Sequence, residues 1–195
     1  MRAFTNYNNV QSYTESMKLP VGAYKVKIMR AEEQGNALCI LFDIAEGEYK
    51  DFYRKKFSND KKAYPSEAKF KGVFRLWYPS GDERDEKNER KMKTALEIIC
   101  ESNSHLHIDF TKEWDGALLK DCCVGMVFQE KEYDYKGNHG FSAQPYSLIT
   151  LADLKEGNFT IPEPKYLNNS TANSQQNQND TFNDMPIDEE DDLPF

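Results

Sequence analysis

The residues with the clearest capacity for chemistry lie between Tyr49 and Tyr78. This segment holds nine basic and three acidic side chains, with nine aromatic side chains interleaved among them. Phosphates bind Lys and Arg, and unstacked bases stack on aromatic rings with a gain of about 1–3 kcal/mol per base. The segment therefore predicts a site for single-stranded nucleic acid, whose candidate residues are Lys50, Tyr53, Arg54, Lys55, Lys56, Phe57, Lys61, Lys62, Lys69, Lys71, Arg75, Trp77 and Tyr78.

Four of these aromatic side chains are the candidates for base stacking: Tyr53, Phe57, Trp77 and Tyr78. The competing interpretation is that the rings form the core and the lysines only a solvated surface. For any single ring the core is favoured, whereas the cluster has more rings than thirty residues can bury beside nine cations. Recognition of duplex bases would favour a helix rich in Arg, Asn and Gln, and the sequence shows none.

Other chemistries have weaker support. His105 and His107, with Cys100 and Asp109 nearby, could be assembled into a metal site, but their spacing matches no zinc pattern. Alternation along a strand also explains a His-x-His sequence. No Ser/His/Asp set, phosphate-binding glycine loop or nucleophile motif is present. We therefore expect neither an enzyme nor a bound metal or cofactor.

The cysteines and the hydropathy pattern suggest a cytoplasmic protein. The four cysteines lack a paired C-x-x-C spacing, which favours buried, reduced thiols at Cys39, Cys100, Cys122 and Cys123. The chain has no apolar run of 18 residues, so no membrane span is expected. Residues 1–10 are polar and aromatic and do not resemble a secretion signal.

Charge is distributed very unevenly along the chain. The net charge is −8, from 25 basic and 33 acidic residues, yet residues 168–195 contain seven acidic residues and no Lys or Arg. Residues 1–167 therefore carry 25 basic and 26 acidic side chains and are close to neutral. An acidic chain of this kind is compatible with a nucleic-acid partner, because the excess acid is segregated.

The elements that must position the candidate residues are mainly strands. Hydrophobic alternation and turn residues predict strands over 24–30, 37–44, 49–57, 118–135 and 141–151, with Pro145 at an edge or bulge. Apolar residues at helical spacing predict one helix around Met92 to Ile99, with the acidic stretch 82–89 in or before its first turns. Residues 58–88 are then an insertion after the third strand.

This order predicts a mainly β, OB-fold-like barrel of five strands with one helix between strands 3 and 4. Another Greek-key barrel or a small α+β sheet would fit nearly as well. We assign the nucleic-acid-binding domain to residues 1–166. An Asn/Gln/Ser-rich linker over 167–187 has too little apolar surface to fold and should be disordered.

The last eight residues form an acidic tip that ends in an aliphatic residue, proline and phenylalanine: Asp188, Glu189, Glu190, Asp191, Asp192, Leu193, Pro194 and Phe195. This tip resembles the C-terminus of bacterial and bacteriophage single-stranded DNA-binding proteins, and the polar linker before it is also similar to theirs. The long segment over 58–88 departs from the housekeeping bacterial proteins, so the chain looks more like a phage or mobile-element version.

The resemblance implies a protein that coats and protects single-stranded DNA during replication, recombination and repair. It also implies that the tip recruits replication, recombination and repair proteins, in the bacterial host cell if the chain is phage-encoded. A recombination mediator or single-strand annealing protein would share both features but assemble into rings or filaments. A nuclease that uses the tail to find partners is a third hypothesis. Homo-oligomerisation stays open.

Overall fold

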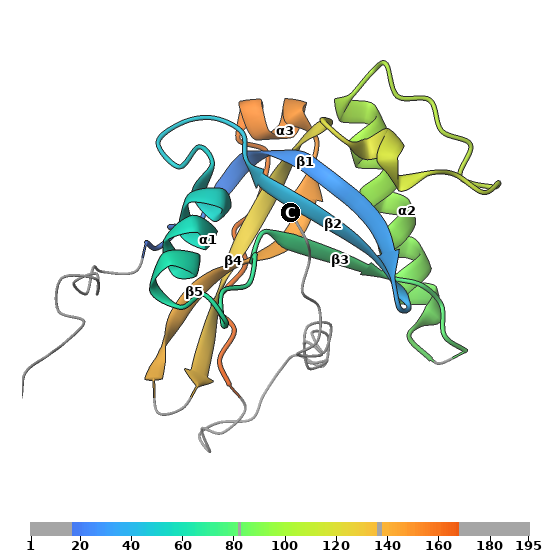
Figure 1. The fold of residues 1–195 in the computed structure, drawn as a ribbon. Coiled ribbons are helices and arrows are strands. Elements are labelled where there is room, and N and C mark those ends of the chain that lie inside the picture. The colour runs from blue at the N-terminus through green and yellow to red at the C-terminus, as the bar shows by residue number, and fades with distance from the viewer. Residues whose placement is uncertain (1–16, 82, 136–137, 168–195) are drawn as a thin grey trace, which may run out of the picture.

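The fold is a single five-stranded antiparallel sheet with helices at its ends. The computed structural model describes residues 17–81, 83–135 and 138–167. In chain order (Figure 1) its elements are β1 (Ala23–Gln34), β2 (Ala37–Ile44), α1 (Phe52–Ala63), β3 (Val73–Trp77), α2 (Asp85–Ser102), the 3₁₀ helix η1 (Gly116–Leu119), β4 (Cys123–Tyr135), β5 (Asn138–Ile149) and α3 (Leu151–Glu156).

The strands lie in the order β3-β2-β1-β4-β5, with β3 and β5 at the two edges of an open sheet. β1 is the central strand that joins the two halves of the sheet, because its first half pairs with β4 and its second half with β2. The pairing of β1 with β2 shifts register between Ile28 and Arg30, a bulge that leaves Met29 unpaired. Such a bulge bends a strand and lets it serve two neighbours.

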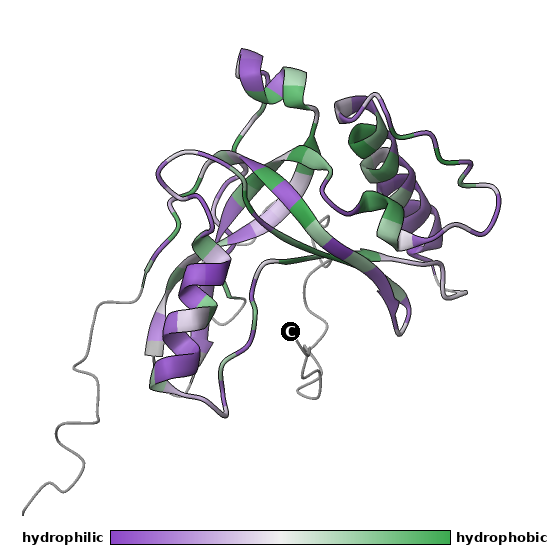
Figure 2. Ribbon diagram, turned by 45° about the horizontal axis from the view of Figure 1, so that its top comes forward, coloured by the Kyte–Doolittle hydropathy of each residue, from purple (hydrophilic) through white to green (hydrophobic). Residues whose placement is uncertain are grey.

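The core lies on one face of the sheet. On β2 the core face holds Leu38, Ile40, Phe42 and Ile44. The residues on its opposite face are also buried: Ala37, Cys39, Leu41 and Asp43. Ile40 and Phe42 point to the core face and belong to the same core cluster as Ala95, Leu96 and Ile99 on the apolar side of α2. Figure 2 shows this apolar stripe on α2, whereas α1 is largely hydrophilic along its length. The helix expected around Met92 to Ile99 is thus confirmed within α2.

The mainly β class, the number of strands and the helix between strands 3 and 4 agree with the structure. The third predicted strand, over 49–57, is wrong, because α1 begins at Phe52. Tyr53 and Phe57 are four residues apart, a spacing that fits both a helical face and strand alternation. The packing of Phe52 and Tyr53 into the core decides for the helix.

The true third strand, β3, lies inside the stretch that the sequence predicts to be an insertion. β3 is only five residues long, and its Val73-Phe-Arg-Leu-Trp77 sequence pairs antiparallel with β2. Gly72 leads into it, and a side chain at this position would lie 2.3 Å from the carbonyl oxygen of Phe42. Glycine is therefore required for the close approach of the two chains.

β4 and β5 form a long hairpin that extends away from the other strands (Figure 1). The expected strand from 118 begins only at Cys123, after η1, and the last strand ends before α3. β5 is an edge strand, and the register shift opposite Val127 and Phe128 lies beside Pro145, as its proline predicts. We call residues 128–144 together with 163–167 the arm, because Lys165 pairs with Lys131 along β4.

The predicted linker from residue 168 onward and the tip at 188–195 lie outside the described residues, as do residues 1–16. All four cysteines are free thiols, with Cys39 and Cys122 buried and Cys100 and Cys123 half-buried. None of the helices in the described part of the chain has the length and apolar character that a membrane crossing requires.

Candidate nucleic-acid interface

The face of β1, β2 and β3 that points away from the core carries a row of cations; we call it the outer face. Directly paired residues in an antiparallel sheet share a face. The pairing of Arg75 with Cys39 and of Trp77 with Ala37 places both long side chains on this face. Arg30 lies opposite Leu41 on the same face. The outer face therefore combines guanidinium groups with one indole ring.

Lys25 and Lys27 extend the outer face along β1, and each already has an acidic neighbour. Lys25 Nζ donates to Glu46 Oε2 at 2.9 Å, and Lys27 Nζ lies 2.6 Å from Asp121 Oδ1. These hydrogen bonds raise the pKa of both lysines above the ordinary value, so both are cationic at neutral pH. Exposed pairs of this kind contribute little to stability and exchange readily with another anion.

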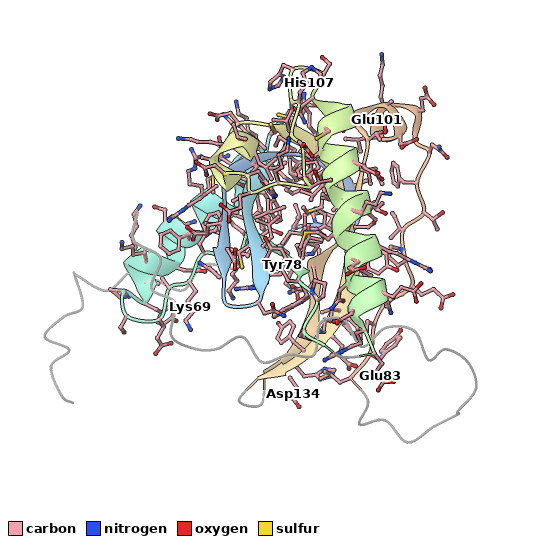
Figure 3. All side chains as sticks on the ribbon, turned by 90° about the vertical axis from the view of Figure 1, so that its right-hand side faces the viewer. Lys69, Tyr78, Glu83, Glu101, His107 and Asp134 are labelled. Atoms are coloured by element: carbon pink, nitrogen blue, oxygen red, sulfur yellow. The ribbon has the colours of Figure 1, made fainter. Side chains whose placement is uncertain are left out.

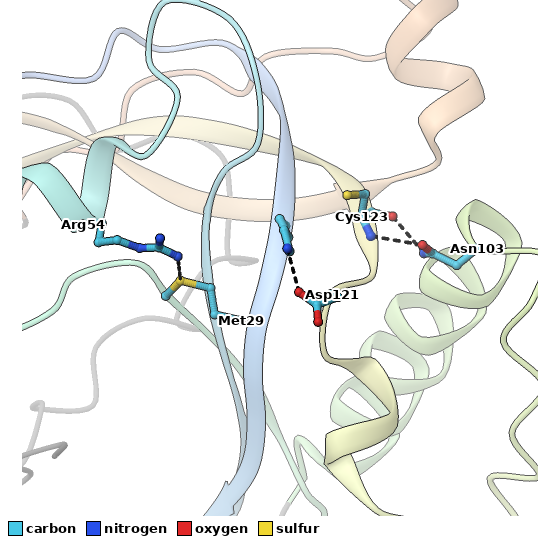
Figure 4. Close-up of polar contacts among 6 residues, drawn as sticks. Met29, Arg54, Asn103, Asp121 and Cys123 are labelled. Carbon is cyan, nitrogen blue, oxygen red and sulfur yellow. Dashed lines mark hydrogen bonds and ion pairs between the residues drawn. The ribbon is translucent and has the colours of Figure 1, made fainter. Parts of the chain in front are cut away.

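Arg54 joins the outer face from α1. Its Nη2 donates to the sulfur of Met29 at the β1 bulge, over 3.2 Å (Figure 4). Its positive charge tends to lower the pKa of Lys27, which places the two cations near each other. Thioether sulfur is a weak acceptor, so most of the five donors of the guanidinium remain available to a ligand. Among the described residues, Arg54 forms no ion pair.

Arg75 lies half-buried in the middle of β3, and no acidic side chain of the described residues forms an ion pair with it. Arg30, by contrast, pairs with Glu32. Among the described residues, the outer face thus has two guanidinium groups without an ion pair, Arg54 and Arg75, and a third, Arg30, that is partly neutralised by Glu32. A ligand with negative charges at intervals, such as a phosphodiester chain, would complement this arrangement.

The remaining predicted cations surround the outer face without belonging to it. Exposed ammonium groups lie on the loop before α1, on α1 and on the segment that leads to β3: Lys50, Lys55, Lys61, Lys62, Lys69 and Lys71. Figure 3 shows Lys69 on the same side of the molecule as α1. Lys56 is half-buried, and burial lowers its pKa. It donates to the backbone oxygen of Met17 at 3.3 Å.

The four stacking candidates lie in very different surroundings. Tyr53 is 5 % exposed and packs edge-on against Phe42, with ring centroids 5.3 Å apart. Burial raises the pKa of its phenol far above the ordinary range. Its ring offers no open surface to a base, so the stacking proposal does not include it.

Phe57 and Tyr78 are half-buried, and each packs against other parts of the protein. The ring of Phe57 lies 6.1 Å from that of Phe70 and has Lys61 Nζ 5.6 Å from its centroid. Tyr78 packs against the core, and burial raises its pKa. Trp77, also half-buried, is the one candidate on the outer face, and it has no ring contact among the described residues.

The sequence prediction missed two groups of residues. The first is the set of β1 cations, because Lys25, Lys27 and Arg30 are spread along an ordinary amphipathic strand and form no local cluster. The period-2 spacing of Lys25 and Lys27 was the available signal for these two. Arg30 is three residues after Lys27 and reaches the same face only through the bulge at Met29. The second is the arm, where Tyr133 is 41 % exposed and Phe141 is 37 % exposed.

The arm continues the sheet beyond the outer face. Lys131 and Tyr133 alternate along β4 in phase with Val127, which pairs with Ala23 on the outer side of β1. The bridge to Lys165 brings a second ammonium group beside Lys131. On the side that continues the outer face, the arm therefore carries the exposed phenol of Tyr133 and two half-buried lysines, Lys131 and Lys165.

No metal site is formed by the described residues, in which no group of three or more His, Cys, Asp or Glu side chains is arranged to hold an ion. Figure 3 shows His107 beyond the Glu101 end of α2. Asp109 instead accepts from the backbone N–H of Thr111 at 3.1 Å and forms an ion pair with Lys112.

In comparisons with known proteins, no family model and no curated protein matches this chain.

Proposed function

We propose that this chain is a single-stranded DNA-binding protein that coats DNA through the outer face of β1, β2 and β3. The observation that supports the proposal best is that one sheet face carries both cations and an aromatic ring. Arg75 and Trp77 are two residues apart on β3, whereas Lys27 and Arg54 lie toward the opposite end of β2. Cations that follow a backbone and a ring that accepts any base are the two requirements of sequence-independent single-strand binding.

The proposal includes a divergent OB-type architecture. OB folds are five-stranded, partly open Greek-key barrels that bind oligonucleotides across strands 2 and 3. Here β1 pairs with both β2 and β4, and α2 lies between β3 and β4. β3 carries Arg75 and Trp77, so one cation and the ring lie on a strand that such domains use, whereas Lys27 and Arg54 are supplied by β1 and α1. The sheet itself is open in this structure.

A direct titration tests the proposal. The full chain is titrated with fluorescent thymidine oligonucleotides, with the same length of duplex and with RNA, at two salt concentrations. We expect tight binding to the single strand and far weaker binding to duplex. Log affinity should fall with log salt by about 0.7 for each phosphate neutralised. Equal affinity for duplex, or binding that ignores salt, would contradict the proposal.

We further propose that the acidic tip recruits replication, recombination and repair proteins. Support comes from its sequence alone: a terminal aromatic ring and carboxylate that follow a run of acids suit an apolar pocket with a basic rim. Deletion of Phe195 should abolish partner capture and leave DNA affinity nearly unchanged. Retention of every partner after this deletion would refute recruitment by the tip.

A further inference from the structure

Asp43, near the end of β2, is the one acidic side chain that is buried in the described residues, with 3 % exposure. Its Oδ1 accepts from the backbone N–H groups of Ile44 and Tyr53, each at 2.9 Å. Its Oδ2 accepts from the backbone N–H of Arg54 at 3.0 Å. Burial raises the pKa of this carboxyl, although the three N–H donors act in the opposite direction.

These bonds make Asp43 the cap of α1, supplied from the sheet. The first N–H groups of a helix have no partner within the helix and are commonly capped by the residue just before it. That residue is Asp51, which is left-handed with φ 59° and makes no side-chain capping bond. The start of α1 is therefore fixed to β2 by a distant carboxylate rather than by its own N-cap residue.

The residue held by Oδ2 is also the one that reaches the outer face. Arg54 receives its backbone position from Asp43 and extends its side chain to Met29, near Lys27. The two oxygens of Asp43 accept different hydrogen bonds: Oδ1 accepts from Ile44 and Tyr53, and Oδ2 accepts from Arg54 alone. A change confined to Oδ2 would therefore loosen Arg54 and keep the other two bonds.

We infer that Asp43 is a positioning residue for nucleic-acid binding: it fixes the start of α1 so that Arg54 presents its guanidinium to a phosphate on the outer face. This inference rests on the proposed function. The expected effect on affinity has an unusual sign, because simple electrostatics predicts that removal of a carboxylate beside a polyanion tightens binding. Positioning predicts that the same change weakens binding.

The experiment compares four variants of the full chain with the wild type: Asp43→Asn, Arg54→Ala, the double variant and Asp109→Asn. Asparagine keeps one acceptor oxygen for Ile44 and Tyr53 but turns an N–H₂ group toward the N–H of Arg54. Asp109→Asn removes the same charge from an exposed loop. Anisotropy titrations use a thymidine oligonucleotide at pH 8 over a range of salt concentrations, and circular dichroism confirms that each variant is folded.

We expect Asp43→Asn to weaken binding several-fold and to reduce the salt slope by about 0.7, which corresponds to one phosphate. Arg54→Ala should produce the same loss, and the double variant should lose no more than Arg54→Ala alone. Asp109→Asn should bind at least as tightly as the wild type. This pattern identifies a loss that passes through Arg54.

Three results would overturn the inference. Asp43→Asn could bind as tightly as the wild type or more tightly; its loss could multiply with that of Arg54→Ala; or Arg54→Ala alone could leave the affinity unchanged. The last result decides the question even if Asp43→Asn does not fold. A wild type that binds no single strand would instead overturn the proposed function, and this inference with it.

Discussion

Two regions of the molecule are rich in aromatic side chains, and they present them in opposite ways. In the segment 49–78, Phe52 and Tyr53 lie in the core, and Phe70 packs against them. In the arm, Phe128 is buried in the core, whereas Tyr133, Phe141 and Tyr166 are more than one-third exposed. The first region has many cations and, among its described residues, one ring that is more than one-third exposed, Tyr64. The second has few cations and three such rings among its described residues. Neighbours along the chain therefore do not decide which rings reach solvent.

The difference arises from long-range packing. Segment 49–78 supplies both α1 and β3, which close one end of the core against β2. The arm extends beyond β1, so its strands have a partner in the sheet plane but little above or below. A two-stranded hairpin is marginally stable by itself, and the pairing of Lys165 with Lys131 gives this one a third chain.

The largest effect that would sharpen this comparison is the loss of a core ring. Tyr53→Ala should lower the free energy of unfolding by about 3–5 kcal/mol, because it removes a buried ring and leaves a cavity. Urea denaturation measures the change. The matched variant in the arm, Tyr133→Ala, should change stability by about 0.5 kcal/mol or less. Similar losses for the two variants would contradict the contrast between the regions.

The next effect concerns binding rather than stability. Trp77→Ala should weaken single-strand binding by about 1–3 kcal/mol, because the outer face loses its one stacking ring. Fluorescence offers a second measurement, since the chain has two tryptophans and Trp114 packs against Phe110 with centroids 5.3 Å apart. In a Trp114→Phe background the remaining signal belongs to Trp77. Emission that ignores saturating DNA would exclude Trp77 from the interface.

Local sequence patterns predict some elements of this fold and miss others. Alternation predicts the first part of β1, a continuous apolar run predicts β2, and helical spacing predicts the middle of α2. Such patterns fail at 52–57, where a spacing of four residues between Tyr53 and Phe57 fits two periods, and at β3, which is too short to show a period. At 52–57 the helix is selected by the hydrogen bond from Tyr53 to Asp43 and by packing in the core. Both are long-range contacts that a local sequence pattern does not show.

The candidate site could be predicted only in part for the same reason. Arg54, Arg75 and Trp77 are all in the cationic segment and all reach the outer face. Lys27 lies some twenty residues earlier and reaches it through strand pairing. The exposed rings of the arm had no local signal, since their exposure follows from what β1 leaves uncovered.

A smaller effect tests the balance of charge on the outer face. Asp121 pairs with Lys27 at 2.6 Å and competes with any incoming phosphate. Asp121→Asn should therefore raise single-strand affinity slightly and steepen the salt slope by at most about 0.7. Asparagine tolerates the positive φ of 68° at this position, so the loop should keep its shape. An unchanged slope would mean that Lys27 does not contact phosphate.

The smallest expected effect belongs to the arm. If its ring extends the interface, Tyr133→Ala should weaken binding only for oligonucleotides long enough to pass from β3 to the arm. Titration with a length series separates this case from an arm that takes no part in binding. An equal loss for the shortest oligonucleotide would mean that Tyr133 and Trp77 contact the same few nucleotides. That outcome would contradict the sheet order, in which β2 and β1 separate β3 from β4.

The open sheet has a consequence for self-association. Exposed strand edges can template the growth of intermolecular sheets, and proteins protect them with short strands, bulges and proline. β3 is five residues long, and β5 carries Pro145 beside a register shift. Both edges are therefore poor templates for continuous backbone pairing. If the proposed function holds, molecules bound side by side on one DNA strand would stay discrete, and they would dissociate without first breaking a fibre.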